Sequence, residues 1–398
     1  MEYRRFGRTG LMMPLFSCGG MRFQWKWQDT PLEQIPPENQ ANLQATVRRA
    51  WDLGITHIET ARGYGSSERQ LGLVLPSLPR EKLIVQTKIV PEADPALFLK
   101  HFDESLERLR LDYVDLLALH GINNDDVAQK ALGPDGRGGC LRAARQLQRQ
   151  GRAKHIGFST HAPSDLLLSL IDHPHNGGFD YVNLHWYWIF QKNAPAIQAA
   201  TQRDMGVFII SPSDKGGKLY APPEKLTRLC QPLHPMAFND LFCLSHREVH
   251  TLSVGAARPS DFDTHVEALK WLPRARELLG PILTRLESSL HQHVPEALRD
   301  PFSLPIPPWE LTPGQINIPV ILWLRNLVDA FDMREYAEMR YNLLGNGGHW
   351  FPGKNAADAE HVDLEPIARM AGIRELVPLL TQTHALLAKA PAQRLSQS

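Results

Sequence analysis

Short hydrophobic runs alternate with longer stretches of helical periodicity over the first 270 residues of the chain. Residues 97–109 repeat their apolar side chains every three to four positions, which is typical of a helix packed against a core. Eight runs have the length of strands, and they end near Cys18, Glu59, Thr87, Leu119, Ser159, Leu184, Ile210 and Val254. Eight strands alternating with helices predict an α/β protein built on a parallel (β/α)8 TIM barrel.

The segment before the first of these strands has a different character. Gly7, Arg8, Thr9 and Gly10 bring together residue types that favour tight turns. They predict a hairpin ahead of the barrel, and we expect its role to be structural.

The pattern changes again near residue 272. Residues 274–293 continue as a long helical pattern, whereas residues 301–308 are rich in proline and cannot form a regular helix or a central strand. A linker or ordered loop is predicted there. A further helix is predicted to begin at Asn317-Ile318-Pro319, where proline falls in the first turn.

The length of the chain supports a second domain. Its 398 residues exceed the roughly 250 of a plain eightfold barrel. We therefore predict a barrel domain over residues 1–272 and a mainly helical extension over residues 273–398.

Composition narrows the class of protein. The 43 basic side chains balance the 43 acidic ones, so nothing favours a nucleic-acid partner. Neither a signal peptide nor an apolar run of about 18 residues is found, so we expect no membrane association and a cytoplasmic protein. The four cysteines form no C-x-x-C pair and are expected to be reduced thiols. No metal site is predicted, and the sequence does not give the oligomeric state.

Four residues able to do acid–base chemistry follow three successive strand candidates. Glu59 ends one hydrophobic run and Tyr64 follows it by five positions, Lys88 lies at the end of the next run, and His120 at the end of the third. Because active sites of barrels lie at the carboxyl ends of the strands, these side chains are expected to meet at one face.

The same four residues carry a resemblance to a known family. Together with the opening segment Tyr3–Leu11 and with Gly19-Gly20-Met21 after the first barrel strand, they make the chain resemble the aldo/keto reductase family, whose members carry Asp, Tyr, Lys and His in this order. Glu59 departs from the pattern by replacing the aspartate. The resemblance implies a hairpin that closes the bottom of the barrel and an NADP(H)-dependent reduction of an aldehyde or ketone to an alcohol.

The chemistry of that reaction suggests a role for each residue. The cofactor supplies a hydride to the carbonyl carbon, and Tyr64 is the expected proton donor to the oxygen. A lysine in contact with the phenol favours its anion, so Lys88 is expected to lower the pKa of Tyr64, with Glu59 keeping the lysine charged. His120 would donate a hydrogen bond to the carbonyl oxygen. The alternative for each residue alone is packing, and for Glu59 a misplaced carboxylate in a weak or inactive site.

The resemblance also implies a set of cofactor contacts. Two departures stand out: Thr160 replaces an asparagine beside Ser159, and Ile210 stands where the family has a ring that stacks on the nicotinamide. Asn183 replaces a glutamine with the same amide chemistry. The implied cofactor-binding residues are Gly20, Met21, Ser159, Thr160, Asn183, Ser211, Pro212, Lys215, Gly217, Arg258 and His265.

Arg258 sets the expected choice of cofactor. It lies in Gly255-Ala256-Ala257-Arg258-Pro259, which resembles the family segment that grips the adenosine phosphate. A guanidinium at a helix start can pair with a 2′-phosphate, so NADP(H) is expected over NAD(H). The alternative is that Arg258 only caps a surface helix. Lys215 and Gly217 lie in a Gly-rich basic loop that suits phosphate, or is only a solvated turn.

Aromatic residues are expected around the substrate. Trp25 and Trp27 follow the first barrel strand, and Trp186, Tyr187 and Trp188 follow the sixth. Aromatic walls suit a small apolar or aryl carbonyl compound. The alternative is that these rings pack the C-terminal extension. Arg62 could hold an acidic group of the substrate or a carboxylate of that extension.

The C-terminal part resembles a ferredoxin-like tail found in one branch of the family. The helix start at Asn317 and the segment 347–353 are present, but no cysteine follows Cys243. Because iron–sulfur clusters need cysteine thiolates, the tail is interpreted as a remnant without a cluster. The same departures keep open a second function, a nucleotide-binding sensor or regulatory protein with little turnover. An electron-transfer enzyme is disfavoured.

Overall fold

The computed structural model describes residues 1–345 and 350–390. These fall into two compact units. The first unit holds residues 1–216 and 239–275, and the second holds residues 217–238 and the chain from residue 276 onward. The segment 217–238, which comes between the last two barrel strands in sequence, therefore belongs with the C-terminal part.

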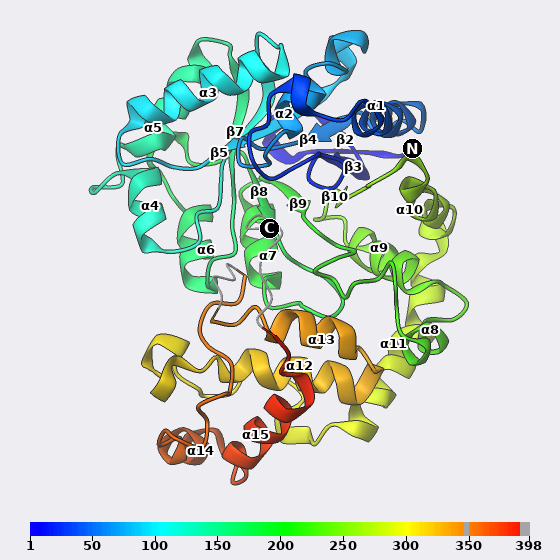
Figure 1. Ribbon diagram of the computed structural model, residues 1–398, viewed down its shortest axis with the longest axis vertical. Helices are drawn as coiled ribbons and strands as arrows, with labels where there is room; N and C mark the ends of the chain where they lie inside the picture. The colour runs from blue at the N-terminus through cyan, green and yellow to red at the C-terminus, as the bar shows by residue number, and fades with distance from the viewer. Residues whose placement is uncertain (346–349, 391–398) are drawn as a thin grey trace. The chain divides into compact units, whose positions relative to one another are not determined.

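Eight parallel strands form a closed barrel in the first unit, in the order β10-β3-β4-β5-β6-β7-β8-β9 (Figure 1). Each strand ends within two residues of its predicted end, which confirms the (β/α)8 fold. The strands are β3 (Phe16–Gly19), β4 (His57–Glu59), β5 (Ile84–Ile89), β6 (Val114–Leu119), β7 (Ala153–Ser159), β8 (Tyr181–Leu184), β9 (Gly206–Ile209) and β10 (Thr251–Val254).

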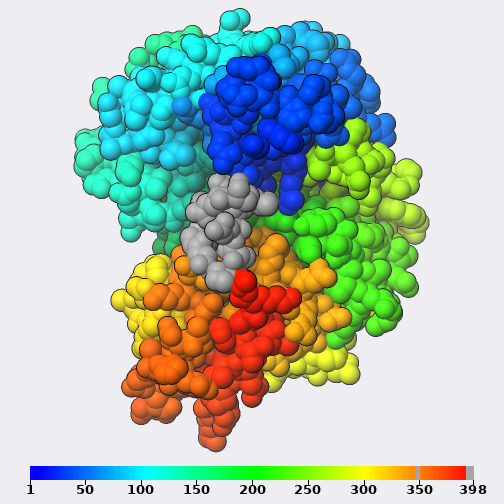
Figure 2. All heavy atoms as spheres, viewed as in Figure 1, coloured from blue at the N-terminus to red at the C-terminus, as the bar shows by residue number. Residues whose placement is uncertain are grey.

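Helices surround these strands in the first unit. Figure 2 shows the outer surface of the molecule, and nearly every residue of the barrel strands is buried. The helices are α1 (Pro37–Asp52), α2 (Ser67–Leu71), α3 (Pro95–Leu109), α4 (Asp125–Leu132), α5 (Gly139–Arg149), α6 (Ser164–Ile171), α7 (Ala194–Gln202), most of α9 (Pro235–Ser245) and α10 (Asp263–Ala268).

The predicted amphipathic helix at 97–109 shows how local sequence sets an element. It is α3, which begins after Asp94, whose side chain accepts a hydrogen bond from the backbone N–H of Ala96. Pro95 lies in the first turn, where its missing N–H costs nothing. The helix ends at Arg110, which has a left-handed backbone.

The predicted hairpin is present ahead of the barrel. Strands β1 (Tyr3–Arg5) and β2 (Met12–Pro14) pair antiparallel around a short 3-10 turn. Gly7 in that turn has φ +50°, and a Cβ there would lie 2.4 Å from the carbonyl oxygen of Asp204, just before β9. The hairpin therefore covers the amino ends of the strands, as the resemblance implied. Hydrophobic residues of the hairpin segment and of the barrel strands form one buried cluster, which comprises Phe6, Met13, Ile84, Leu116, Ala118, Tyr181 and Phe208.

The described part of the second unit is mainly helical. The helix predicted at Asn317 is α12, in which the Asn317 side chain accepts a hydrogen bond from the backbone N–H of Val320, and residues 301–308 have no regular structure. Residues 347–349 of the second tail motif lie outside the described residues. The helices are α8 (Glu224–Cys230), α11 (Ala275–His293), α12 (Ile318–Phe331), α13 (Arg334–Tyr341), α14 (Glu365–Ala371) and α15 (Leu376–Leu387).

A search of the helices within residues 1–345 and 350–390 finds none with both the length and the apolarity needed to cross a bilayer. The four cysteines are buried free thiols, as expected.

Candidate active site

The four predicted catalytic residues come from neighbouring strands of the barrel. Alternate residues of a strand point to the same face, so His57 and Glu59 share the inner face of β4. Strand β5 pairs with β4 and carries Lys88 near its carboxyl end, and β6 follows with His120 directly after its last residue. The active-site layer is thus set by the strand register.

Lys88 connects the acid and the tyrosine. Its ammonium donates a hydrogen bond to Glu59 Oε1, a second to the carbonyl oxygen of Thr60 at 2.8 Å, and a third to the Tyr64 hydroxyl at 3.3 Å. Lys88 is 1% exposed and Glu59 3% exposed. A buried ammonium with a paired carboxylate and two further acceptors is fully satisfied, which holds all three side chains in one geometry.

The pKa directions differ from the expectation for Tyr64. Burial raises the pKa of the Tyr64 phenol well above its ordinary value, and the Glu59 carboxylate raises it further. Burial lowers the pKa of Lys88, while Glu59 opposes that by favouring the charged ammonium. The net direction is therefore opposite to the expected lowering of the Tyr64 pKa, because burial and the Glu59 carboxylate together raise it. The phenol keeps its proton, as a proton donor must.

Two rings flank the Tyr64 phenol. His120 packs edge-on against it with ring centroids 5.7 Å apart, and Trp27 does the same at 6.0 Å. The loop that carries Trp27 is held to α2, because Ser66 and Gln70 accept hydrogen bonds from the Trp25 backbone N–H. Trp27 therefore lies beside the Tyr64 ring, whereas the Trp25 side chain is 39% exposed.

The ends of β7 and β8 carry the residues expected at the nicotinamide. The Ser159 hydroxyl accepts from the backbone N–H of Gly121, which leaves its own proton to donate. The Thr160 hydroxyl donates to the carbonyl oxygen of Ile122 and accepts from the N–H of Ala162, so it is used within the protein. Of this pair, Ser159 is the better candidate for a cofactor contact.

Asn183 tests whether a nicotinamide fits the site. Its side chain is completely buried, and neither its amide oxygen nor its amide nitrogen has a hydrogen-bond partner among the described residues. Unsatisfied buried amides are costly and rare in native proteins. A carboxamide offers one donor and one acceptor to match. The chain thus fits a nicotinamide at the end of β8.

The loop after β9 turns sharply at the same end of the barrel. Ser211 has a φ of +55°, and a Cβ at Gly216 would lie 1.9 Å from the carbonyl oxygen of Pro212. The Lys215 ammonium lies 3.4 Å from His161 Nε2 and 3.3 Å from His185 Nε2. Gly217, the remaining predicted residue of this loop, is the first residue of the second unit.

The two residues expected at the adenosine end differ in exposure. The Arg258 side chain is 73% exposed, and its Nε donates to Asp261 at 3.0 Å. His265 is buried, and its Nδ1 lies 2.6 Å from the buried Asp240 carboxylate. His265 therefore ties α10 to α9 through Nδ1, and the adenine contact expected of it stays a prediction.

Other predicted residues have partners inside the barrel unit. The Trp186 ring stacks on Phe242 at 5.0 Å and is buried against α9. Arg62 pairs with Glu104 of α3 through one terminal nitrogen, while its other terminal nitrogen has no hydrogen-bond partner among the described residues. The backbone N–H of the half-buried Trp188 donates to Asn239.

Gly20 and Met21 follow β3. A Cβ at Gly20 would lie 2.7 Å from the Glu59 carbonyl oxygen, so close approach to β4 requires glycine there. Met21 is half-buried.

Sequence reasoning missed an ion pair at this face. Arg22, after β3, lies 2.9 Å from Asp214, after β9. The two strands flank β10, and a Cβ at Gly255, just after β10, would lie 3.2 Å from Arg22 Cγ. The pair thus spans the end of β10. The sequence offered one sign of this pair, because Arg22 directly follows Met21 and Asp214 directly precedes Lys215, and both neighbours are predicted cofactor residues.

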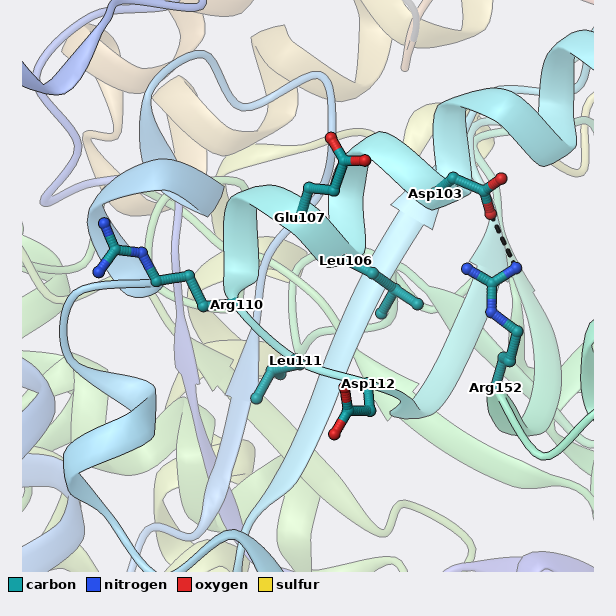
Figure 3. A pocket seen from close by; sticks show the side chains of 7 residues that line it. All are labelled: Asp103, Leu106, Glu107, Arg110, Leu111, Asp112 and Arg152. Atoms are coloured by element: carbon teal, nitrogen blue, oxygen red, sulfur yellow. Dashed lines mark ion pairs between the residues drawn. The ribbon is translucent and has the colours of Figure 1, made fainter.

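A surface groove of about 560 Å³ lies at the other end of the strands (Figure 3). The ion pair between Asp103 and Arg152, 2.8 Å long, lies at one side of it. Because its lining residues precede β6 and β7, it is remote from the carboxyl ends that carry the active-site layer. The groove is lined by Asp103, Leu106, Glu107, Arg110, Leu111, Asp112 and Arg152.

This barrel, with acid, tyrosine, lysine and histidine at the carboxyl ends of its strands, matches a known protein family. Residues 16–214 match the model of the "Aldo/keto reductase family". They are half of the chain and include β3 to β9. The chain belongs to the aldo/keto reductase family.

Individual relatives are distant. L-galactose dehydrogenase of Arabidopsis thaliana is 30% identical over 223 residues, 54% of this chain and 65% of the relative. L-glyceraldehyde 3-phosphate reductase of Escherichia coli is 27% identical over 179 residues, 41% of this chain and 46% of the relative. The chain thus spans less than two thirds of these two relatives. An aldo-keto reductase from Bacillus halodurans in its holo form has the same fold, with a TM-score of 0.59 at 19% identity, over 72% of this chain and 96% of the other.

Proposed function

We propose that the protein is an NADP(H)-dependent oxidoreductase that reduces an aldehyde or ketone to an alcohol. The observation that carries this proposal is the Lys88 ammonium held between the Glu59 carboxylate and the Tyr64 hydroxyl. This contact places a neutral phenol, with its proton, beside a fixed positive charge at the active face of a barrel.

Each side chain has a stated role in the proposed reaction. A bound nicotinamide supplies the hydride to the carbonyl carbon. The Tyr64 hydroxyl transfers its proton to the carbonyl oxygen, so the product is a neutral alcohol. Lys88 stabilises the phenolate left behind, and Glu59 keeps Lys88 charged and in place. His120, beside the phenol, donates a hydrogen bond to the carbonyl oxygen as negative charge develops there.

Residues at the carboxyl ends of several strands would hold the cofactor. Asn183 and Ser159 can exchange hydrogen bonds with the carboxamide. The loop from Ser211 to Lys215 and the Arg22–Asp214 pair lie at the neighbouring strand ends, where the phosphates would follow. Arg258 is exposed and can turn to a 2′-phosphate, which favours NADP(H) over NAD(H), although Asp261 competes for its guanidinium.

The substrate side is less polar. Trp27 flanks the Tyr64 phenol, and an aromatic wall suits a small apolar or aryl carbonyl compound. The names of two relatives, L-galactose dehydrogenase and L-glyceraldehyde 3-phosphate reductase, support carbonyl chemistry in general without fixing the substrate.

The test is turnover of 4-nitrobenzaldehyde with NADPH, followed by loss of NADPH absorbance, beside a fluorescence titration of NADPH binding. The proposal expects both binding and steady turnover, and loss of turnover with retained binding in Lys88→Met. Binding without turnover by the unaltered protein, across a panel of aliphatic and aryl aldehydes, would instead support the nucleotide-binding sensor.

A further inference from the structure

Glu59 faces two small residues of the neighbouring strands. Gly19 of β3 is the register partner of Glu59 on β4, and β10, which carries Ser253, pairs with the other side of β3. Ser253 is 8% exposed. Although Ser253 is opposite Ser17 in the register, the three residues form one buried group on β10, β3 and β4.

The small side chains of Gly19 and Ser253 leave space beside the Glu59 carboxylate. Glu59 Oε1 is bonded to Lys88, while Oε2 points the other way and lies 3.5 Å from Ser253 Oγ. A Cβ at Gly19 would lie 2.7 Å from Ser253 Oγ and 3.3 Å from Glu59 Oε2. Any larger side chain at residue 19 or 253 would thus enter the volume that the Glu59 carboxylate and the Ser253 hydroxyl share.

That volume matters because of the length of glutamate. The strand register fixes the Cα positions of Glu59 and Lys88, so the extra methylene relative to aspartate must be taken up by the side chain. With the space open, the carboxylate can lie with one oxygen on the ammonium and the other toward Ser253. With the space closed, the carboxylate is displaced along Lys88, and displacements of about 1 Å in a catalytic array can cost about 100-fold in rate.

We propose that Gly19 and Ser253 are positioning residues whose small side chains provide the space that sets the Glu59 carboxylate on Lys88. Glutamate at this position is then matched to its neighbours and is no defect of the site. This inference rests on the proposed function, because it assigns the two residues to the reaction through Glu59.

The experiment is a double-mutant comparison in two backgrounds, the unaltered protein and Glu59→Asp. Ser253→Val fills the space with a residue that strands accept well, whereas Ser253→Ala removes the hydroxyl and keeps the space. Both are made in each background. Reduction of 4-nitrobenzaldehyde over a range of pH, NADPH affinity and the thermal midpoint Tm are measured for these six proteins and for Gly19→Ala in the unaltered background.

The expected result depends on the length of the acid on β4. Ser253→Val should lower kcat at least about 10-fold and shift the pH–rate profile when that acid is glutamate, and change kcat less than about 3-fold in the Glu59→Asp background. Ser253→Ala should change kcat less than about 3-fold in both backgrounds, with NADPH affinity constant throughout. Gly19→Ala should follow Ser253→Val if the shared space is the cause.

The Tm values test the packing without relying on turnover. Ser253→Val should lower Tm by several degrees in the unaltered background and by less than half as much in the Glu59→Asp background, because only the longer acid needs the space. Equal losses of kcat and Tm in the two backgrounds would overturn the inference, and so would a Ser253→Val protein indistinguishable from its parent. Absence of turnover in every protein would reject the proposed function. The Tm values alone would then decide whether residues 19 and 253 provide the space that Glu59 needs.

Discussion

The Lys88 ammonium lies 3.3 Å from the Tyr64 hydroxyl while it is also bonded to the Glu59 carboxylate. This places the phenol in contact with a positive charge that is already neutralised by a buried acid. Burial and Glu59 raise the pKa of Tyr64, so the phenol proposed as proton donor is protonated at neutral pH. The ammonium becomes effective when the proton leaves and a phenolate forms beside it.

Removing the Glu59 charge should change the pH dependence of the reaction. Glu59→Gln takes away the group that opposes the burial-lowered pKa of Lys88, so that pKa should fall further. Lys88 then loses its proton at lower pH, and the alkaline limb of the kcat/KM profile should move to lower pH. Circular dichroism checks the fold. Glu104→Gln, which removes a carboxylate from α3, is the control and should leave the profile in place. An unchanged profile in Glu59→Gln would reduce the site to Tyr64, Lys88 and His120.

The choice of cofactor should depend on Arg258. Arg258→Ala should weaken NADPH binding roughly 10- to 100-fold and leave NADH binding nearly unchanged, because only NADPH carries the 2′-phosphate. Asp261→Asn should strengthen NADPH binding by freeing the guanidinium. Arg49→Ala, which breaks another exposed ion pair near α10, is the matched control and should do neither. Fluorescence titration measures all four proteins, and equal affinity of the unaltered protein for both cofactors would reject the assignment.

Asn183 should affect stability and cofactor binding in opposite directions. Asn183→Leu replaces a buried amide that lacks partners by an apolar side chain of similar size, so the free energy of unfolding should stay level or rise by up to about 1–2 kcal/mol. NADPH affinity should fall about 10-fold, since the carboxamide loses its two hydrogen bonds. Urea unfolding and NADPH titration measure the two effects. For comparison, Asn342→Leu, which removes an amide bonded to two backbone carbonyls, should only destabilise. A destabilised Asn183→Leu protein with normal NADPH affinity would contradict this role.

Stability should fall in mild acid because of His57. This histidine is fully buried beneath Glu59 on β4, bonded to Ser17, and burial lowers its pKa to about 3. The unfolded chain takes up a proton on His57 near pH 6.5, and the folded protein does not. The free energy of unfolding that is linked to neutral His57 is therefore fully present above about pH 6.5, and it is lost as pH falls toward 3. Between pH 6.5 and 5 this one residue should cost about 2 kcal/mol of unfolding free energy.

Urea unfolding of the unaltered protein and of His57→Asn over that pH range measures the effect. The variant should be less stable at pH 7.5 but flatter with pH. A variant with the same slope as the unaltered protein would assign the acid sensitivity to other groups.

The fold and part of the site could be predicted from the sequence because both depend on local patterns. The strand ends follow from hydrophobic runs, and the strand order of a barrel then brings Glu59, Lys88 and His120 to one face. The hairpin at Gly7 and the helix start at Asn317 follow from turn and capping chemistry.

What the sequence could not supply is which distant residues meet. The sequence does not show that His265 lies beside Asp240, 25 positions away. It also does not show that Arg62 pairs with Glu104 or that Trp186 stacks on Phe242. The direction of the Tyr64 pKa depends on three-dimensional geometry for the same reason, because burial and the nearby Glu59 carboxylate together raise it.

The most direct measurement is reduction of 4-nitrobenzaldehyde by Tyr64→Phe beside the unaltered protein, with NADPH binding titrated in both. Removing one hydroxyl deletes the proton donor and little volume, so turnover should fall at least about 100-fold while NADPH affinity stays within about 3-fold. Turnover by Tyr64→Phe at the rate of the unaltered protein would contradict the account, because it would place the proton donor elsewhere.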